Sequence, residues 1–396
     1  MFSIKRSISM LSICIAALLL AGCGGGVPDT PSFTFPDSGS KSSRPSSTQS
    51  VSEPDSSATS TEPQSDISEQ TPSVETSEPA PETSEPVSVT PEVYSLTLSY
   101  DPVNEKTIEV SGKTAVISGK TADSPIDHMS VFPRSAEFDL NSDEYGFSAE
   151  VVMTEPFSGY LTVTLVYEDG HYDEVELAVT QNGFALWELS DIVENNRNVV
   201  KTAVEQPQNQ VAEYIVKGGR PDDIRKVLEE IQALSDEICE GLDSDYDKLR
   251  AISRWVSANI YYDYPAYDKG VPDETLSLKY MLDRHSSVCG GYSNMTSALC
   301  AAQGIKCWNV HGAALAGGLT FLSSNRSEYH EWNFAEIDGR VIWVDSGWNS
   351  YCYLRRDGVY ENGGICYRYF DIGEEYFALN HKASYAEYRD YFAILR

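Results

Sequence analysis

Basic residues are scarce in this chain. Its 396 residues include 29 Lys and Arg against 60 Asp and Glu, so the formal net charge is −31. This imbalance excludes nucleic acid as a partner, because proteins bind the phosphate backbone through cationic side chains that displace its counterions. It also disfavours electrostatic docking on anionic lipid. A basic or neutral polypeptide partner is compatible with the charge, although the acidic excess can equally serve only to keep an exported protein soluble.

Long apolar runs, nucleotide-binding glycine loops and metal-binding cysteine pairs are missing as well. One apolar run, Met10–Ala21, stands out, and it is too short to span a bilayer as a helix. No phosphate-binding glycine loop occurs, so no cofactor is implied. Four cysteines could in principle form a zinc site, but they lack the tight paired spacing of zinc ligands; they are Cys300, Cys307, Cys352 and Cys366. We therefore expect neither a cofactor nor a metal.

The N-terminus has the features of an export signal. Lys5 and Arg6 precede the apolar run, whose length is that of a signal-peptide core. The run ends in Leu20–Cys23, which resembles a bacterial lipobox, where the cysteine is diacylated and begins the mature protein. Two acyl chains suffice for stable anchoring; the alternative is a plain secretory signal with an incidental cysteine. We expect residues 1–22 to be a lipoprotein signal peptide and Cys23 to anchor the chain on the extracytoplasmic face of the cell membrane.

Residues 23–92 have the composition of a tether. Eleven of the 19 prolines fall between Val27 and Glu92, and Ser, Thr and Glu fill most of the remainder. Such a stretch cannot bury enough apolar surface to offset its ordering entropy, so we expect it to be disordered. It would reach about 200 Å at the polyproline limit and roughly 45 Å as a coil. That length suits a spacer that carries a domain away from a membrane, for instance through a cell wall.

Residues 93–182 have the pattern of a β domain. The segments Tyr160–Tyr167 and Glu174–Val179 alternate between two faces, and Asp169-Gly170 between them is a turn signal. Several short strands without a helical pattern predict a small all-β sandwich of immunoglobulin type. This domain is interpreted as a spacer or a binding accessory, and it contains no catalytic set.

Residues 190–396 change to a helical period and then to strands. Pro221 begins a predicted helix, and Ser244 can cap a second one with an apolar stripe from Leu249 to Ile260. Strand-like segments follow from Cys307 onward. Helices first and an antiparallel sheet afterwards predict an α+β fold for this region.

Cys289 precedes a predicted helix. The apolar spacing of Met295, Ala298, Leu299 and Ala302 places the beginning of that helix near Met295. A thiol at a helix N-terminus faces unpaired N–H groups and the positive end of the helix dipole, both of which favour the nucleophilic thiolate. A buried structural cysteine is the alternative, and this segment alone does not decide between them.

A β-hairpin predicts a partner for this thiol. His330–Ile337 and Arg340–Asp345 are strand-like, and Asp338-Gly339 between them is a strong two-residue turn signal. Asp345 then lies opposite Trp332, so that His330 is a diagonal neighbour of Asp345 on the same face. Such a pair can be a surface ion pair, but the neighbouring tryptophans favour a half-buried one. A carboxylate that orients an imidazole, and an imidazole that accepts a thiol proton, are the parts of a Cys–His–Asp triad.

The order and spacing of these three residues are similar to the transglutaminase-like superfamily core. His330 follows Cys289 by 41 residues and Asp345 lies 15 residues beyond it. The segments that resemble the family are Val288-Cys289-Gly-Gly-Tyr-Ser, Val310-His311-Gly312, His330-Glu-Trp-Asn and Val344-Asp345-Ser-Gly-Trp348. Upstream, Tyr246–Trp255 is similar to the helix that precedes the family core. Ser287 and Ser346-Gly347 depart from the residues common in the family, which leaves the subfamily open.

The resemblance implies a papain-like α+β fold and acyl transfer through a Cys289 thioester. The backbone N–H of Cys289 is expected to bind the oxyanion, with Tyr262 as a second donor. Hydrolysis and transamidation both stay open, as does a cell-wall-associated protein or peptide substrate. The rival hypothesis is a non-catalytic surface lipoprotein that uses the same fold as a scaffold for binding.

The remaining cysteines and histidines receive structural interpretations. A Cys352–Cys366 disulfide is considered, because Asn362–Gly364 can form the turn between them. His311 and His285 are interpreted as packing or loop residues, and no role is evident for His381.

Overall fold

The computed structural model describes residues 92–396, except 122–123, 144, 156–157, 171, 188, 207–210, 317–319 and 322–323. The chain divides into two units, Met1–Thr83 and Ser84–Arg396, and the description below concerns the second. The predicted signal peptide, the lipidated Cys23 and nearly all of the tether lie outside the described residues. Among the described residues, no helix combines the length and apolarity needed to cross a membrane.

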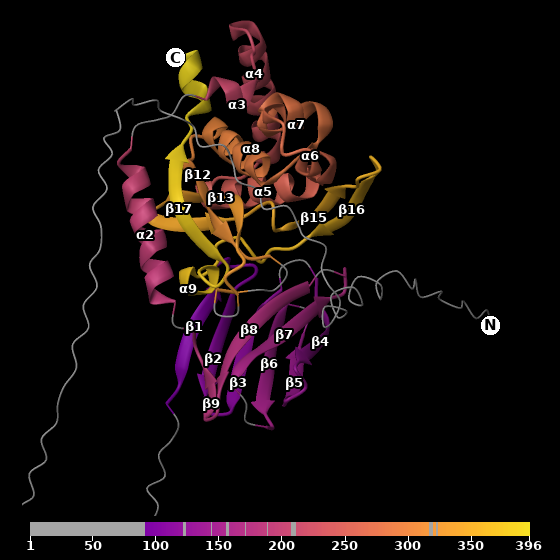
Figure 1. The fold of residues 1–396 in the computed structure, drawn as a ribbon, viewed down its shortest axis with the longest axis vertical. Coiled ribbons are helices and arrows are strands. Elements are labelled where there is room, and N and C mark those ends of the chain that lie inside the picture. The colour runs from indigo at the N-terminus through magenta and orange to yellow at the C-terminus, as the bar shows by residue number, and fades with distance from the viewer. Residues whose placement is uncertain are drawn as a thin grey trace, which may run out of the picture. The chain divides into compact units, whose positions relative to one another are not determined.

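The first part of the described chain consists of two antiparallel sheets (Figure 1). One sheet has the order β1-β2-β3-β6-β5 and the other β4-β7-β8-β9. The strands are β1 (Tyr94–Ser99), β2 (Lys106–Ser111), β3 (Thr114–Lys120), β4 (Ile126–Phe132), β5 (Ala136–Ser142), β6 (Gly146–Met153), β7 (Gly159–Tyr167), β8 (Tyr172–Thr180) and β9 (Gly183–Ala185).

Alternating burial explains why these segments form strands. In β7, Leu161, Val163 and Leu165 are buried while the residues between them are partly exposed. They share a hydrophobic cluster with residues of the other sheet, such as Ile117. The predicted strand pair around Asp169-Gly170 is confirmed, since β7 and β8 are antiparallel neighbours and Gly170 takes the positive φ of a turn. The β-rich character of this region is confirmed, while its immunoglobulin-type topology stays a prediction.

The second part of the chain carries most of the helices. They are α2 (Ser190–Val204), α3 (Ala212–Ile215), α4 (Pro221–Ile238), α5 (Asp245–Asn259), α6 (Tyr264–Asp268), α7 (Leu278–Arg284), α8 (Cys289–Ala302) and α9 (Glu374–Phe377), with 3-10 turns η1 (Asp273–Leu276) and η2 (Tyr391–Leu395). Two predicted starts are confirmed. Helix α4 begins at Pro221, and Ser244 caps α5 by accepting a hydrogen bond from the N–H of Asp247.

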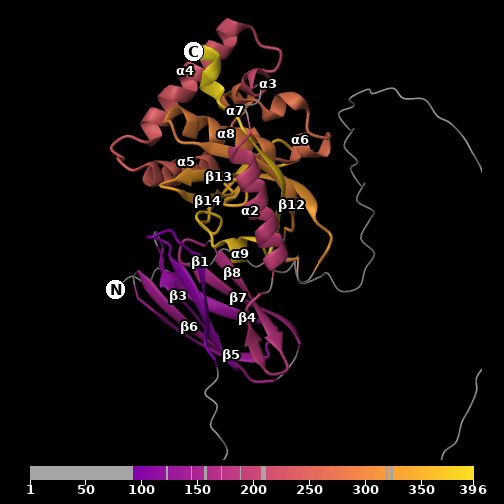
Figure 2. The same ribbon diagram turned by 90° about the vertical axis from the view of Figure 1, so that its left-hand side faces the viewer.

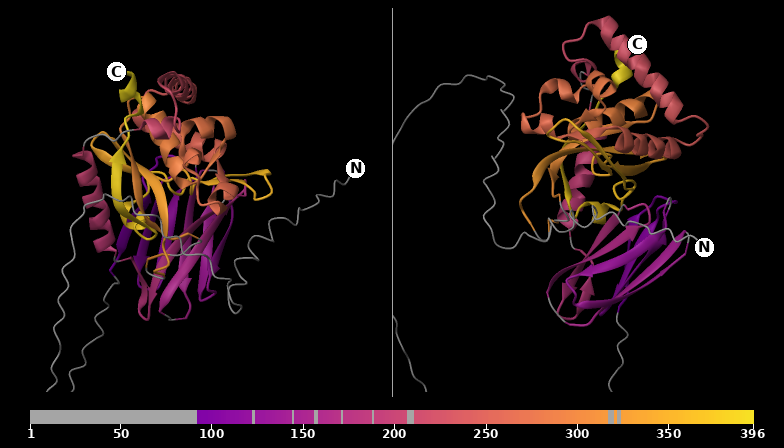
Figure 3. Two further views of the ribbon diagram at one scale, coloured as in Figure 1. Left: turned by 45° about the horizontal axis from the view of Figure 1, so that its top comes forward. Right: turned by 90° about the vertical axis from the view of Figure 1, so that its right-hand side faces the viewer.

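Two four-stranded sheets accompany these helices. The sheet with the longer strands is antiparallel and has the order β14-β13-β12-β17. Its strands are β12 (Cys307–Ala314), β13 (Glu328–Ile337), β14 (Arg340–Val344) and β17 (His381–Tyr388). The sheet with the shorter strands has the order β11-β10-β15-β16, and its strands are β10 (Tyr261–Asp263), β11 (Ser286–Ser287), β15 (Ser350–Leu354) and β16 (Tyr360–Ile365). Helix α2 lies against β17 (Figure 2), and η2 lies beside α4 (Figure 3). The predicted sequence of helices followed by antiparallel strands is confirmed.

The hairpin of β13 and β14 has the predicted register. Asn333 pairs with Val344 and Ile337 with Arg340, which leaves a two-residue loop. Asp338 and Gly339 both have positive φ, as a type I′ turn requires. Asp345 therefore follows directly after the last paired residue of β14.

Helix α8 is the buried helix of this part of the chain. It packs against α4, α5, β12 and β13, and every residue from Gly290 to Cys300 is buried. The prediction that Cys289 lies at the N-terminus of a helix is confirmed, and the helix begins at Cys289 itself, earlier than the apolar spacing from Met295 indicated. The low helix propensity of Gly290 and Gly291 hid the first turn. A Cβ on Gly291 would lie 1.9 Å from Ser287 Oγ, so close packing requires glycine there.

The β-rich part and the part that follows are joined by a continuous hydrophobic cluster. It runs from Ile117 of β3 through Trp187 and Tyr376 to Trp332 of β13. Backbone contacts accompany it, since the N–H of Tyr100 donates to Asp371 O at 2.9 Å. These two parts therefore share a core.

Candidate active site

Cys289 is the first residue of α8, and its side chain is half-buried. The first N–H groups of a helix have no partner within the helix, so they face the space beside this thiol. Two hydrogen bonds tie the first turns of α8 to β13. Ser293 Oγ donates to Trp332 O at 3.0 Å, and Asn333 Nδ2 donates to Ser293 O at 3.1 Å. These bonds hold the N-terminus of α8 against the strand that carries His330.

His330 and Asp345 form a buried pair. His330 Nε2 lies 2.6 Å from Asp345 Oδ2, and the side chains are 9% and 1% exposed. The hairpin register produces this contact, because His330 on β13 is the diagonal neighbour of the residue that follows β14. With Nε2 on the carboxylate, Nδ1 is the ring nitrogen left for the Cys289 thiol. The structure thus brings the two hairpin residues together at the N-terminus of α8, as the sequence predicted.

The pKa of His330 reflects both partners. Burial lowers the pKa, but the Asp345 carboxylate and a hydrogen bond to Cys289 raise it to about 10. Burial raises the pKa of Asp345, and the His330 and His381 side chains lower it by more, to well below its usual range. Both shifts favour an imidazolium beside a carboxylate. This charge state is the one in which a neighbouring thiolate is stabilised.

Aromatic rings fix the orientation of the His330 imidazole. Trp348 stacks on it with ring centroids 4.8 Å apart, and Trp332 lies on it at 5.9 Å. Trp348 also binds Asp345, because its backbone N–H donates to Oδ1 at 2.9 Å. The segment Asp345–Trp348 is therefore a turn closed by the carboxylate, which a small Ser-Gly pair accommodates.

His381 is the residue that sequence reasoning missed. No role was evident for it from the sequence, and the structure places its Nε2 3.1 Å from Asp345 Oδ2. His381 begins β17 and is fully buried. Its distance in sequence from Asp345 carries no motif, and only the placement of β17 beside β12 brings it to the site. No pattern in the sequence alone indicates that His381 contacts Asp345.

Tyrosines surround the thiol. Burial raises the pKa of Tyr262, Tyr267 and Tyr329, and nearby negative charge, including that of Cys289, raises each further. Their hydroxyls therefore stay protonated at neutral pH and can donate hydrogen bonds. Tyr262, the predicted second oxyanion donor, lies in β10, which pairs with β11 just before Cys289. The side chains of Tyr267 and Tyr329 are about half exposed.

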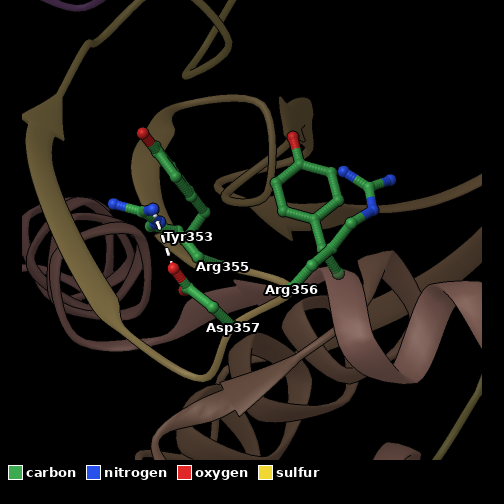
Figure 4. A pocket seen from close by; sticks show the side chains of 5 residues that line it. Tyr353, Arg355, Arg356 and Asp357 are labelled. Carbon is green, nitrogen blue, oxygen red and sulfur yellow. Dashed lines mark hydrogen bonds and ion pairs between the residues drawn. The ribbon is translucent and has the colours of Figure 1, made fainter.

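A hollow adjoins this tyrosine group (Figure 4). It measures about 310 Å³ and is lined by Tyr264, Tyr353, Arg355, Arg356 and Asp357. The ring of Tyr264 contacts that of Tyr262 with centroids 5.3 Å apart. Arg356 lies over Tyr264 and is ion-paired with Asp268 at 2.6 Å. The hollow is thus one ring away from Tyr262, on the side of the site formed by β15 and α6.

His311 is a packing residue, as interpreted from the sequence. It is buried between Glu331 and Glu387, with a nitrogen 3.4 Å from a carboxylate oxygen of each. Burial lowers its pKa, but these two carboxylates raise it overall. The Glu331 carboxylate lies beside the first turn of α8, where a Cβ on Gly290 would approach it to 3.1 Å. His285, by contrast, ends α7 with a left-handed backbone, in agreement with the loop interpretation.

The considered Cys352–Cys366 disulfide is not formed. Both cysteines are free and buried. Cys352 pairs across the strands with Asn362, while Cys366 lies beyond the end of β16 with its N–H bonded to Asn349 O. The two positions are several residues apart along the sheet, and a disulfide requires neighbouring Cα atoms.

Comparison with known proteins supplies the class. Residues 232–350 match the family model described as the transglutaminase-like superfamily, and this segment of the chain belongs to that superfamily. The matched segment includes Cys289, His330 and Asp345 and ends before His381.

The similar proteins are distant. The chain is 27% identical over 121 residues to the Kyphoscoliosis peptidase of Mus musculus and 25% identical over 158 residues to that of Homo sapiens, which covers 30% and 40% of this chain. It spans only 18% and 22% of the length of these relatives. A crystal structure of a candidate cysteine protease from Cytophaga hutchinsonii is 14% identical over 64% of this chain and 75% of its own, with a TM-score of 0.26. A likeness that weak constrains neither the fold nor the activity.

Proposed function

We propose that this chain is a cysteine acyltransferase or hydrolase that acts on protein or peptide amides, with Cys289, His330 and Asp345 as its catalytic triad. The observation that carries the proposal is the buried contact of 2.6 Å between His330 and Asp345 beside a half-buried thiol at a helix N-terminus. Family membership and a relative whose name contains the word peptidase support the same class.

The proposed first step is acylation. Cys289 Sγ attacks the amide carbonyl carbon while its proton resides on His330 Nδ1, and the C–N bond breaks as His330 returns the proton to the leaving amine. Asp345 holds the imidazole by Nε2 and stabilises its positive charge throughout. The carbonyl oxygen develops negative charge, and we expect the backbone N–H of Cys289 and the hydroxyl of Tyr262, whose pKa is raised by burial, to donate hydrogen bonds to it.

The second step releases the acyl group. Water or an amine attacks the thioester, His330 takes the proton of the nucleophile, and Cys289 leaves as a thiolate. Water makes the enzyme a peptidase or amidase, and an amine makes it a transamidase. Tyr267 and Tyr329 flank the thiol with exposed rings, which suits a polypeptide chain as substrate better than a small enclosed molecule.

The proposed setting is the outer face of the cell membrane. The support for it is in the sequence alone: the lipobox-like Leu20–Cys23 and a Pro-rich stretch that can act as a spacer. Radiolabelled palmitate incorporation in a bacterial host, compared between the wild-type chain and Cys23→Ala, tests the anchor.

The test of the triad needs no substrate. The full-length chain in detergent is treated with iodoacetamide over a range of pH, and alkylation of Cys289 is followed by peptide mass spectrometry. Cys239, Cys300, Cys307, Cys352 and Cys366 are buried and should react slowly. We expect His330→Ala to slow Cys289 alkylation at neutral pH at least tenfold, because the thiolate loses its imidazolium partner.

Matched controls come from the exposed His128–Asp127 pair of β4. His128→Ala and Asp127→Asn should leave the alkylation profile as in the wild type, while Asp345→Asn should slow the reaction. If Cys289 reacts as an ordinary thiol and neither His330→Ala nor Asp345→Asn changes it, the chain is a binding scaffold and not an enzyme of this type.

A further inference from the structure

The Asp345 carboxylate has more donors than a triad needs. Oδ1 accepts the N–H of Trp348, while Oδ2 receives both His330 Nε2 at 2.6 Å and His381 Nε2 at 3.1 Å. Two imidazoles thus share one oxygen of a carboxylate that is 1% exposed. One of them, His330, also hydrogen-bonds Cys289, and the other, His381, is the first residue of β17.

The neighbours of His381 determine its tautomer. Its Nδ1 lies 2.7 Å from Asn380 Oδ1, and Asn380 Nδ2 donates to the Tyr369 hydroxyl at 3.0 Å. An amide oxygen only accepts, so in this orientation a neutral ring would carry its proton on Nδ1 and turn the Nε2 lone pair toward the Asp345 carboxylate. Rotating the Asn380 amide by 180° leaves its shape unchanged and satisfies every group with a neutral ring: Tyr369 donates to Asn380 Oδ1, Asn380 Nδ2 donates to Nδ1, and Nε2–H donates to Asp345.

The surroundings agree with a neutral ring. Burial lowers the pKa of His381 to about 4, because the attraction of Asp345 does not offset desolvation and the nearby charges of His330 and Arg368. A second imidazolium at Asp345 would repel the charged His330 and compete for the carboxylate. A neutral donor stabilises the carboxylate while leaving its negative charge for His330.

The ring is held firmly in place. It stacks on Phe377 with centroids 4.1 Å apart and lies against Trp348 at 4.5 Å. Its backbone carbonyl accepts a hydrogen bond from Asn196 Nδ2 of α2 at 3.0 Å, and Asn196 Oδ1 accepts from the N–H of Ala383. An element distant in sequence therefore fixes where His381 points.

A metal ion would explain the same three residues less well. The ligand atoms of His330, Asp345 and His381 lie within 4.8 Å of one another, close enough for the three side chains to be considered as ligands of one metal ion. Two ligands bound to one zinc at about 2.0–2.1 Å with a tetrahedral angle lie roughly 3.3 Å apart. The observed 2.6 and 3.1 Å from the imidazoles to Asp345 Oδ2 are hydrogen-bond distances.

We propose that His381 is a positioning residue of this site, a second imidazole that donates a proton from Nε2 to Asp345 and holds its carboxylate against His330. The inference rests on the proposed function of the triad. Without this donor, the carboxylate is held by the Trp348 N–H and His330 alone, and it supports the His330 imidazolium less well. Alkylation of Cys289 beside that imidazolium should then be slower at neutral pH.

The experiment measures Cys289 alkylation by iodoacetamide against pH in the full-length chain. His381→Phe keeps the stacking ring and removes the donor, while His381→Gln keeps an amide N–H near the position of Nε2. We expect His381→Phe to lower the rate at pH 7 about tenfold, the effect of one hydrogen bond to a charged group. The loss should have the direction of that in Asp345→Asn and be smaller, and His381→Gln should restore most of the wild-type profile.

The outcomes separate the two hypotheses. If His330→Ala leaves the profile unchanged, the proposed function fails and the inference fails with it. If His330→Ala slows alkylation but His381→Phe has the wild-type profile, the triad stands and the role of His381 is overturned. Equal loss in His381→Phe and His381→Gln also overturns it, because the N–H donor would then be irrelevant.

Folding and metal controls complete the test. Circular dichroism melting identifies unfolded variants, and if His381→Phe does not fold, His381→Asn replaces it, since the shorter amide cannot reach Asp345. Imidazole ¹⁵N shifts of the wild type should show His381 neutral with its proton on Nε2. If EDTA converts the wild-type profile into that of His381→Phe, a bound cation and not a hydrogen bond holds the cluster, and the inference is wrong.

Discussion

His330 is enclosed by groups that act on its charge in opposite directions. Burial disfavours the imidazolium, and Asp345 with Cys289 favours it strongly enough to raise the pKa to about 10. Because this folded-state pKa lies above the ordinary value of 6.5, protonation of His330 stabilises the folded state. That contribution is complete below about pH 6.5 and is lost as the pH rises through about 10.

The stability difference between two variants measures this effect. We expect the free energy of unfolding of Cys289→Ser to exceed that of Cys289→Ser/His330→Phe by an amount that shrinks by on the order of 2 kcal/mol between pH 7 and pH 10.5, because Asp345 still raises the pKa of His330 once the contribution of Cys289 is removed. The serine removes titration of the thiol, and taking the difference cancels the lysines and tyrosines that titrate in the same range. Urea unfolding at several pH values provides the data. A difference that stays constant over this range would contradict a paired His330.

At the scale of the element, the start of α8 decides where the thiol lies. Gly291 has no room for a side chain, since a Cβ would lie 1.9 Å from Ser287 Oγ and 3.0 Å from Met281 Sδ. Ser287 is the last residue of β11, two residues before Cys289. A side chain at Gly291 must therefore displace either β11 or the first turn of α8, and the thiol moves with both.

We expect Gly291→Ala to slow Cys289 alkylation at pH 7 at least fivefold and to destabilise the fold by about 1–3 kcal/mol, the usual cost of overpacking. The matched control is Gly146→Ala in β6, where the nearest atom to a new Cβ is the flexible Asp143 carboxylate at 3.3 Å. Alkylation rates and urea midpoints are measured for both. A Gly291→Ala variant with the wild-type alkylation rate would show that the thiol is not positioned by this contact.

The features that could be predicted from the sequence are those that interactions between neighbouring residues determine. The β13–β14 hairpin was predictable, because Asp338-Gly339 and the alternation of its strands are local signals. A helix after Cys289 was predictable as well, but its exact first residue was not, since tertiary packing overrides the low helix propensity of Gly290 and Gly291. His381 reaches Asp345 only through the order of strands in a sheet, which local periodicity does not encode.

At the scale of the molecule, the β-rich part and the part that carries the site share a hydrophobic cluster. Tyr376 of α9 donates a hydrogen bond to Glu174 O of β8 and packs on Trp187 with centroids 5.7 Å apart. The next residue, Phe377, stacks on His381. The contacts that join the two parts thus end one ring away from Asp345.

A shared core should unfold as one cooperative unit. Ile117 of β3 is fully buried in the cluster, and Ile117→Ala should cost about 2–5 kcal/mol through the cavity it leaves. We expect hydrogen exchange to show that amides in β13, whose Trp332 and Phe334 belong to the same cluster, lose as much protection as amides in β3. The control, Phe138→Ala at a half-exposed position of β5, should leave both unchanged. Loss of protection confined to the β-rich part would mean that the two parts unfold independently.

The cluster that runs from Ile117 through Trp187 to Trp332 also has a consequence for descent. A gene that exchanged its β-rich segment for an unrelated one would inherit the catalytic strands without the side chains that cover them. Selection would remove such recombinants unless the new segment carried complementary apolar residues. Across related genomes, the β-rich segment and the strands that bear Trp332 and His381 should therefore occur together in one chain. Substitutions on one side of their contact should be accompanied by compensating substitutions on the other side.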